Sequence, residues 1–287
     1  MYEDVLLPFD GSEGATTVLR HAAEIADWAD ATIRVLFVAD TSRDSVTVVE
    51  GQTVDALAKQ GERVVEGAAE TLRSLGVDPK TDVVQGNPAV TIADYAEQYG
   101  YDLVVMPTRG REGISRYLVG SVTEKVVRLS SVPVLTARLQ PDERLAFPYE
   151  NVLVPTDRSP VSMRAVDHGL ELAAALGATA HAVAAADDTS LGPDVRSTVA
   201  SDAGETAARE ALEDVTEAAS AYELGPVVEH LERGKPVDGI LSCIDEHDID
   251  AVVMGTTGRR GTDRILLGSV TEKTVRSAPV PVITVGE

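Results

Sequence analysis

Short apolar runs alternate with longer amphipathic segments along the first half of the chain. The apolar runs, rich in valine, leucine and isoleucine, predict strands near residues 3–8, 31–38, 81–85, 102–106 and 132–137. The amphipathic segments predict helices near residues 12–28, 50–75, 88–99 and 121–130. Strands that alternate with helices form parallel sheets through right-handed crossovers, so the pattern predicts an α/β fold.

The second half of the chain repeats the first half in the same order. The first strand and its turn, residues 5–12, recur as residues 152–159. The run Gly-Ser-Val-Thr-Glu-Lys is identical at residues 120–125 and 268–273. A repeat this long predicts a duplicated domain rather than a short-period solenoid.

A polar stretch with a proline, residues 140–144, separates the two copies and has the composition of a linker. The predicted domains are residues 1–139 and 148–287. Each is expected to hold a Rossmann-like, five-stranded parallel sheet.

A glycine-containing loop follows the fourth strand of the second copy. The apolar run 251–254 leads into Gly255 and Gly258, and Gly268 and Ser269 open the next helix. Glycine lets a backbone approach a ligand closely, and the N–H groups at a helix N-terminus bind anions. Ligands of open parallel sheets lie outside the carboxyl ends of the strands. The loop is therefore predicted to bind phosphate.

This loop resembles that of the universal stress protein (UspA) family, and the resemblance covers nearly the whole chain as two copies. ATP-binding members carry Gly-x2-Gly-x9-Gly-Ser/Thr, an aspartate after the first strand and a small apolar residue that ends the second strand. The resemblance implies that Asp157 lies at the adenine and ribose end and that Ala185 lines the adenine pocket. It assigns to this nucleotide site Asp157, Ala185, Met254, Gly255, Gly258, Gly268, Ser269 and Val270.

The first copy departs from this pattern at one glycine. Pro107 stands where the second copy has Gly255. Proline has no N–H and fixes φ near −65°, so a donor is lost if this amide contacts phosphate, and the turn is restricted if glycine needs positive φ. We expect weaker binding in the first copy, at Asp10, Val38, Met106, Gly110, Gly120, Ser121 and Val122.

Several of these residues also have a purely structural interpretation. Ser121 and Ser269 each stand three residues before a glutamate, the pattern of a capping box, and would then only cap their helices. Asp10 and Asp157 would then only bond backbone amides of their own turns. The loops also carry four arginines that either pair with phosphate or are solvated: Arg109, Arg111, Arg259 and Arg260.

Two histidines and the single cysteine are interpreted as structural. His21 and His168 recur within the first helix of each copy, and no metal-ligand spacing lies nearby. Cys243 lies in an apolar helical stretch and is expected to be a small buried hydrophobe. A single cysteine forms no intrachain disulfide, which favours a reducing interior.

The net charge limits the partners of the protein. A formal charge of −22 over 287 residues excludes a basic face for nucleic acid or anionic membranes. An acidic surface with only five lysines is associated with halophiles. The sequence has no apolar run of about 18 residues and no signal-peptide pattern at its N-terminus. It therefore predicts a soluble, cytoplasmic protein.

The resemblance implies a stress-response or regulatory protein that binds ATP, with Mg²⁺ or Mn²⁺ on the phosphates and without dedicated catalysis. It also implies that the copies pair through their last strands as an intrachain pseudo-dimer, with or without a further homodimer. One alternative is a weak ATP hydrolase or phosphoryl-transfer enzyme. The sequence lacks the P-loop, zinc-protease and nucleophile-elbow motifs that would favour it. The other alternative is an interaction scaffold that binds no nucleotide.

Overall fold

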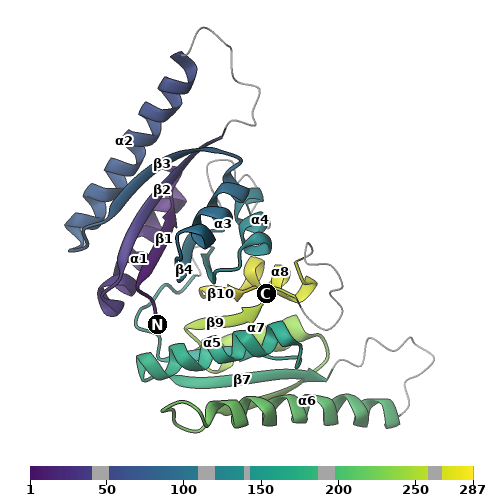
Figure 1. Ribbon diagram of the computed structural model, residues 1–287. Coiled ribbons are helices and arrows are strands. Elements are labelled where there is room, and N and C mark those ends of the chain that lie inside the picture. The colour runs from purple at the N-terminus through teal and green to yellow at the C-terminus, as the bar shows by residue number, and fades with distance from the viewer. Residues whose placement is uncertain (41–51, 109–119, 139–142, 187–197, 258–266, 287) are drawn as a thin grey trace. The chain divides into compact units, whose positions relative to one another are not determined.

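The computed structural model describes residues 1–287 except 41–51, 109–119, 139–142, 187–197, 258–266 and 287. The chain divides into two compact units, Met1–Pro141 and Asp142–Glu287 (Figure 1). In the described part of the chain, no helix combines the length and apolar character needed to cross a membrane.

The first unit contains one parallel sheet with strand order β3-β2-β1-β4-β5. Its strands are β1 (Asp4–Pro8), β2 (Thr32–Asp40), β3 (Lys80–Gly86), β4 (Leu103–Pro107) and β5 (Val134–Ala137). Its helices are α1 (Glu13–Ala29), α2 (Gln52–Ser74), α3 (Pro88–Gln98) and α4 (Ser121–Leu129). Helix α1 packs beside α2, and α3 packs beside α4.

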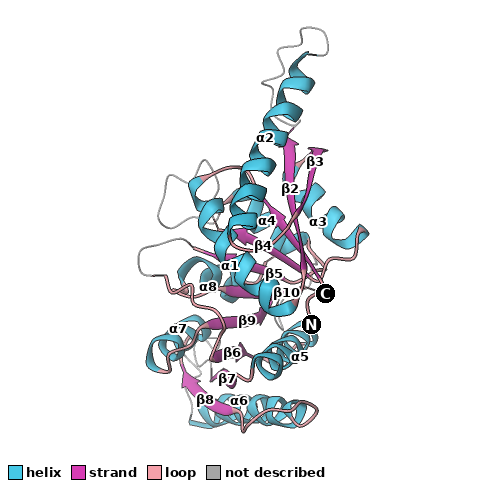
Figure 2. Cartoon of the chain, turned by 90° about the vertical axis from the view of Figure 1, so that its left-hand side faces the viewer, coloured by secondary structure: helices cyan, strands magenta, loops and turns pink. Residues whose placement is uncertain are grey.

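The second unit repeats this topology with strand order β8-β7-β6-β9-β10, again parallel throughout. Its strands are β6 (Asn151–Pro155), β7 (Thr179–Ala186), β8 (Val228–Arg233), β9 (Ala251–Gly255) and β10 (Val282–Val285). Its helices are α5 (Pro160–Leu176), α6 (Thr198–Ala219), α7 (Pro236–Glu246) and α8 (Ser269–Ser277). In each unit, helices cover both faces of the sheet (Figure 2). The predicted α/β fold with tandem five-stranded parallel sheets is confirmed.

Burial explains why the strands are apolar runs rather than alternating patterns. Strands β4 and β9 lie inside their sheets and are buried at every position. Helices on both faces leave such strands no solvent side, so each position favours an apolar residue. The edge strands β3 and β8 are largely exposed or half-buried, and they carry the charged residues.

The first helix of each unit is fixed by a serine cap. The hydroxyl of Ser12 accepts the N–H of Ala15, and that of Ser159 accepts the N–H of Ser162, each at 3.2 Å. Such caps satisfy one of the N–H groups that a helix start leaves without an intrahelical acceptor. The cap places each first helix directly behind the turn that carries Asp10 or Asp157.

Candidate functional site

The carboxyl end of β9 meets the N-terminus of α8 through backbone contacts. The N–H of Gly268 donates to the carbonyl oxygen of Thr256 at 2.8 Å. The hydroxyl of Thr271 donates to the carbonyl oxygen of Gly255 at 2.7 Å. A β-carbon on Gly268 would lie 3.2 Å from the Thr256 oxygen and 3.5 Å from the Cα of Thr257. The chain that leaves β9 therefore returns to it before α8 begins.

The backbone contacts between the end of β9 and the start of α8 determine which N–H groups remain available to bind an anion. The N–H of Gly268 is used by Thr256. The first N–H groups of a helix have no intrahelical acceptor. In α8 the N–H of Glu272 is the first to bond within the helix, to the carbonyl oxygen of Gly268, which leaves those of Ser269, Val270 and Thr271. The positive end of the helix dipole adds to their attraction for a negative charge. The donors that α8 itself offers are therefore the N–H groups of Ser269, Val270 and Thr271, and the role of Gly268 is to let the backbone pass close to Thr256.

The capping-box interpretation of Ser121 and Ser269 is wrong. Gly120 and Gly268 are the N-caps, and each serine is the first helical residue. Neither helix has a side-chain hydrogen bond at its cap. Both serines are exposed at the end of the sheet where a ligand would lie.

Gly255 serves close packing and not a left-handed turn. It is the last residue of β9 and pairs in register with Val285, so its backbone is that of a strand. A β-carbon on it would lie 3.1 Å from the backbone nitrogen of Ser162 and from the carbonyl carbon and oxygen of Val161. These atoms form the first turn of α5. The close approach of helix and strand leaves little room for a side chain here.

Pro107 takes the corresponding place in the first unit without breaking the strand. It is buried, ends β4 and pairs with Ala137. The next residue, Thr108, donates its N–H to the carbonyl oxygen of Ala137 at 2.7 Å. Because the equivalent Gly255 is extended, positive φ is no part of the difference between the units. What the first unit lacks is one N–H at the carboxyl end of its sheet.

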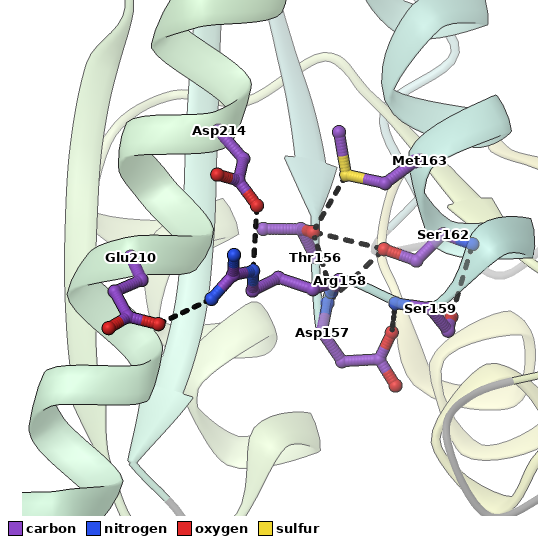
Figure 3. A network of polar contacts seen from close by, with 8 residues as sticks. All are labelled: Thr156, Asp157, Arg158, Ser159, Ser162, Met163, Glu210 and Asp214. Carbon is purple, nitrogen blue, oxygen red and sulfur yellow. Dashed lines mark hydrogen bonds and ion pairs between the residues drawn. The ribbon is translucent and has the colours of Figure 1, made fainter.

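The turn after the first strand of each unit is built around its aspartate. Asp157 Oδ1 accepts the N–H of Ser159 at 3.0 Å, and Asp10 Oδ1 accepts that of Ser12 at 2.9 Å. The N–H of Asp157 itself donates to Ser162 Oγ at 3.2 Å (Figure 3). The structural role of both aspartates is therefore confirmed. A carboxylate has about four acceptor positions, so a structural role does not by itself exclude contact with a ligand.

Arg158, which follows Asp157, has a left-handed backbone with φ 64°, where the first unit has Gly11 with φ 76°. A side chain in this conformation costs about 1–2 kcal/mol. The Arg158 guanidinium pairs with Glu210 and with Asp214, both on α6, and its Nε lies 2.7 Å from Asp214 Oδ2 (Figure 3). These contacts offset part of the cost and direct the side chain toward α6. The sequence interpretation missed this residue.

Comparison with known proteins assigns the chain to a family. The model of the universal stress protein family matches residues 1–138 and 148–286. The chain belongs to the universal stress protein family. A universal stress protein of Methanocaldococcus jannaschii is 31% identical over 141 residues, which cover 48% of this chain and 83% of that relative. Universal stress protein YxiE of Bacillus subtilis is 30% identical over 148 residues, which cover 48% of this chain and all of YxiE.

A solved structure shares the full length of the chain. The universal stress protein from Archaeoglobus fulgidus DSM 4304 superposes with a TM-score of 0.77 at 26% identity. The match covers 99% of this chain and 98% of that chain. Both copies of the domain therefore have counterparts in that universal stress protein.

The fold brings most of the residues assigned to the second site to one edge of its sheet. Asp157 follows β6, Ala185 lies near the carboxyl end of β7, and Met254 and Gly255 end β9. Ala185 is half-buried between buried neighbours. The first unit places its assigned residues at the equivalent edge: Asp10 after β1, Val38 in β2, Met106 in β4, and Gly120, Ser121 and Val122 at the start of α4. Gly110, Gly258 and the four loop arginines lie outside the described residues.

Of the residues interpreted as structural, His21 and Cys243 are buried and His168 is half-buried in this universal stress protein. Burial lowers the pKa of His21 and of His168 to about 4, so both are neutral at pH 7. Burial, followed by the charges of Glu232 and Glu246, raises the pKa of the Cys243 thiol to about 12. A thiol that stays protonated is a poor nucleophile. Within the described ranges, no group of three histidine, cysteine or acidic side chains is placed to hold a metal ion.

Proposed function

We propose that this universal stress protein binds ATP or a related adenine nucleotide in its second unit. The phosphates would accept hydrogen bonds from the N–H groups of Ser269 and Val270 at the start of α8 and from that of Gly255 at the end of β9. The ribose and adenine would extend toward Asp157. The observation that carries the proposal is the shared edge: exposed helix donors, a strand end without side chain and a carboxylate all lie at the carboxyl ends of β6 and β9. The choice of adenine rests on membership of the universal stress protein family.

Electrostatics favour a nucleotide that carries its own cation. A protein with a net charge of −22 repels anions at long range. Local backbone donors act at short range, and a divalent ion on the phosphates lowers the charge that approaches the protein. The donors named here come from the backbone, and the described residues do not form a metal site of their own. We therefore expect Mg²⁺ or Mn²⁺ to arrive bound to the phosphates.

The first unit would bind the same ligand more weakly. Ser121 and Val122 start α4 as Ser269 and Val270 start α8. Pro107, however, offers no N–H in the place of Gly255. Loss of one hydrogen bond to a charged phosphate costs about 1.5–3 kcal/mol, or roughly tenfold to a hundredfold in affinity.

The proposed role is regulatory rather than catalytic. Bound nucleotide would change the conformation or association of the protein, as the absence of P-loop, zinc-protease and nucleophile-elbow motifs from the sequence favours. The intrachain pseudo-dimer and any further homodimer stay predictions. Small-angle scattering and light scattering of the full chain, with and without ATP, measure both.

The acidic composition supports a protein that works at high salt. Repulsion within a charge of −22 weakens as the Debye length falls from about 10 Å at 0.1 M to about 3 Å at 1 M. Thermal melts in potassium chloride should give a midpoint that rises between these concentrations. A midpoint that stays constant or falls would remove this part of the proposal.

Ligand identity is tested on the purified full chain. We expect mass spectrometry of protein purified at high salt to find a co-purified adenine nucleotide. Titration with MgATP, MgADP, AMP and MgGTP should then rank MgATP first, because the N-terminus of α8 selects phosphates and the family assigns adenine to the Asp157 end. Equal affinity for MgATP and MgGTP would reject the adenine assignment. Slow release of phosphate from bound MgATP would favour the hydrolase alternative.

A further inference from the structure

Three of the five histidines gather at the amino-terminal edge of the second unit, opposite the proposed nucleotide edge. His181 is the third residue of β7, His230 is the third residue of the edge strand β8, and His247 follows α7. His181 and His230 are 6% and 8% exposed. The centroids of the His230 and His247 rings are 4.2 Å apart. The proposed nucleotide site does not involve these side chains.

The hydrogen bonds of Asn151 fix the protons on this cluster. Its Nδ2 donates to the carbonyl oxygen of Asp248 at 3.3 Å, so its Oδ1 faces His181 Nε2, also at 3.3 Å. An amide oxygen only accepts, so His181 Nε2 carries a proton. Nδ1 of neutral His181 is then an acceptor, and His230 Nε2 donates to it at 3.0 Å. One chain of hydrogen bonds thus joins β8 to β7 and β7 to β6.

The ring geometry identifies a hydrogen bond rather than a metal-ligand pair. The rings of His181 and His230 are inclined by only 4°, and their centroids are 5.3 Å apart. The centroid distance is longer than the 3.0 Å between His181 Nδ1 and His230 Nε2 by about two ring radii. The two rings therefore lie edge to edge, and the two nitrogens face each other between them. Two nitrogens on one tetrahedral metal ion would lie about 3.3 Å apart, with both lone pairs directed at the ion and not at each other. A shared proton fits the space, and a metal ion does not.

At the equivalent strand positions of the first unit, an ion pair takes the place of the histidine pair. Arg34 is the third residue of β2, and Asp82 is the third residue of the edge strand β3. Arg34 Nη1 lies 3.9 Å from Asp82 Oδ2, which also accepts the hydroxyl proton of Tyr95 at 2.7 Å. Burial and the hydrogen bond to Asp82 raise the pKa of Tyr95 far above neutrality. Arginine, aspartate and such a tyrosine keep their charge states between pH 5 and 8, whereas histidine does not.

We propose that the His181–His230 hydrogen bond, with His247 beside it, is an acid-sensitive lock that holds the edge strand β8 and helix α7 to the second unit. One added proton enters at His230 Nδ1 and leaves the bond to His181 intact. A second proton, on His181 Nδ1, sets two N–H groups against each other and breaks the bond. The first proton therefore weakens the lock, because the open state binds it more tightly, and the second proton breaks the hydrogen bond itself.

The groups around the pair oppose its protonation in the closed state. From the α7 side, His247 repels positive charge on both rings, while Glu246 attracts it to His230; β6 contributes the neutral Asn151. Burial is the largest influence, and together these lower the pKa of His230 to about 4 and that of His181 below its usual value. The open state, with ordinary histidines, binds more protons. The stabilisation is therefore full above about pH 6.5 and is lost as the pH falls toward 4.

Hydrogen exchange of the full chain tests the lock, with the first unit as internal control. Protection factors, corrected for the intrinsic pH dependence of exchange, are measured at pH 7.5 and 5.0 and constant ionic strength. With values of about 4 in the closed and 6.5 in the open state, titration of His230 alone lowers protection of β8 and α7 about 25-fold. Protection of β3 and α3 should change less than about threefold once His21→Gln has removed the acid response of the buried histidine of the first unit. An equal change in both units, or no change in β8, overturns the proposal.

Paired variants separate the lock from general acid effects. His181→Arg combined with His230→Asp installs the pair of the first unit and should abolish the acid loss of protection in β8. The control His168→Gln removes a half-buried histidine outside the cluster, and the 25-fold loss that the cluster contributes in β8 and α7 should remain. If the double variant does not fold, His247→Gln, at an exposed position, should reduce the loss by relieving repulsion. A full acid response in the folded double variant, or in His247→Gln when the double variant fails to fold, contradicts the proposal.

Discussion

The two units share a backbone but differ in the side chains at both edges of their sheets. At the carboxyl edge, Gly11 and Pro107 of the first unit correspond to Arg158 and Gly255 of the second. The left-handed turn after the first strand and the register at the end of the fourth strand are kept in both. The comparison teaches that strand order and turn geometry tolerate these exchanges. We expect ligand affinity and pH response to differ between the units through the few residues that were exchanged.

Exchange of the residues at positions 107 and 255 should have the largest effect, and this effect is on nucleotide affinity. Pro107→Gly restores an N–H to the first unit and should raise its affinity for MgATP about tenfold or more, since a bond to a charged group contributes about 1.5–3 kcal/mol. Gly255→Pro should weaken the second unit by a similar factor. Calorimetric titration measures both. If neither exchange alters affinity, this N–H has no role in binding.

The buried histidines should make the stability of both units sensitive to acid. The expected loss of free energy of unfolding is close in size to the loss of binding free energy in the previous prediction. Burial lowers the pKa of His21 and His168 to about 4 from the usual 6.5, so unfolding takes up protons between these values. Stability is full above pH 6.5, and at pH 5 each histidine should cost about 2 kcal/mol. Urea unfolding at pH 7 and pH 5 checks this, with His21→Gln and His168→Gln as variants of smaller pH dependence. Equal stability at both pH values would show that burial does not lower the pKa of these histidines.

Substitution of Arg158 should have a smaller effect that depends on the residue introduced. Arg158→Gly removes the ion pairs with Glu210 and Asp214 but also removes the strain of a left-handed side chain, so stability should change by less than about 0.5 kcal/mol. Arg158→Ala loses the ion pairs and keeps the strain, and should cost about 1 kcal/mol. Chemical denaturation compares the two. A glycine variant less stable than the alanine variant would contradict the strain argument.

The smallest effect is expected at Thr274 in α8, where the first unit has Val126 in α4. Thr274 is fully buried, and its hydroxyl has no hydrogen-bond partner in the described part of the protein. Thr274→Val should therefore stabilise the protein by up to about 1 kcal/mol. Val126→Thr is the matched change and should destabilise it. Thermal melts detect both, and a loss of stability in Thr274→Val would indicate an unseen partner for the hydroxyl.

Most of the fold could be predicted because hydrophobic pattern and repeat carry it. The expected helix at 88–99 is α3, Pro88–Gln98, and the expected strand at 81–85 is β3, Lys80–Gly86. The glycine positions could also be found, since a glycine loop before a helix is a local signal. The use of the Gly268 N–H could not, because its acceptor on Thr256 is set by how the loop closes.

The histidine cluster could not be predicted from the sequence for a related reason. Asn151, His181, His230 and His247 are far apart in the sequence and meet only through the order β8-β7-β6 and the end of α7. Arg158 did have a signal, because arginine replaces glycine in a repeated turn. Comparison of the copies position by position would have identified it.

The central claim is that the N-terminus of α8 holds the phosphates of the tighter nucleotide. Calorimetry with MgATP on Gly268→Asp and the matched Gly120→Asp tests it most directly, with circular dichroism to verify folding. A side chain on Gly268 meets the Thr256 oxygen, and a carboxylate there repels phosphate. We predict that Gly268→Asp abolishes the tight binding event and that Gly120→Asp affects only the weaker one. Tight binding that survives in folded Gly268→Asp but is lost in Gly120→Asp would contradict the account.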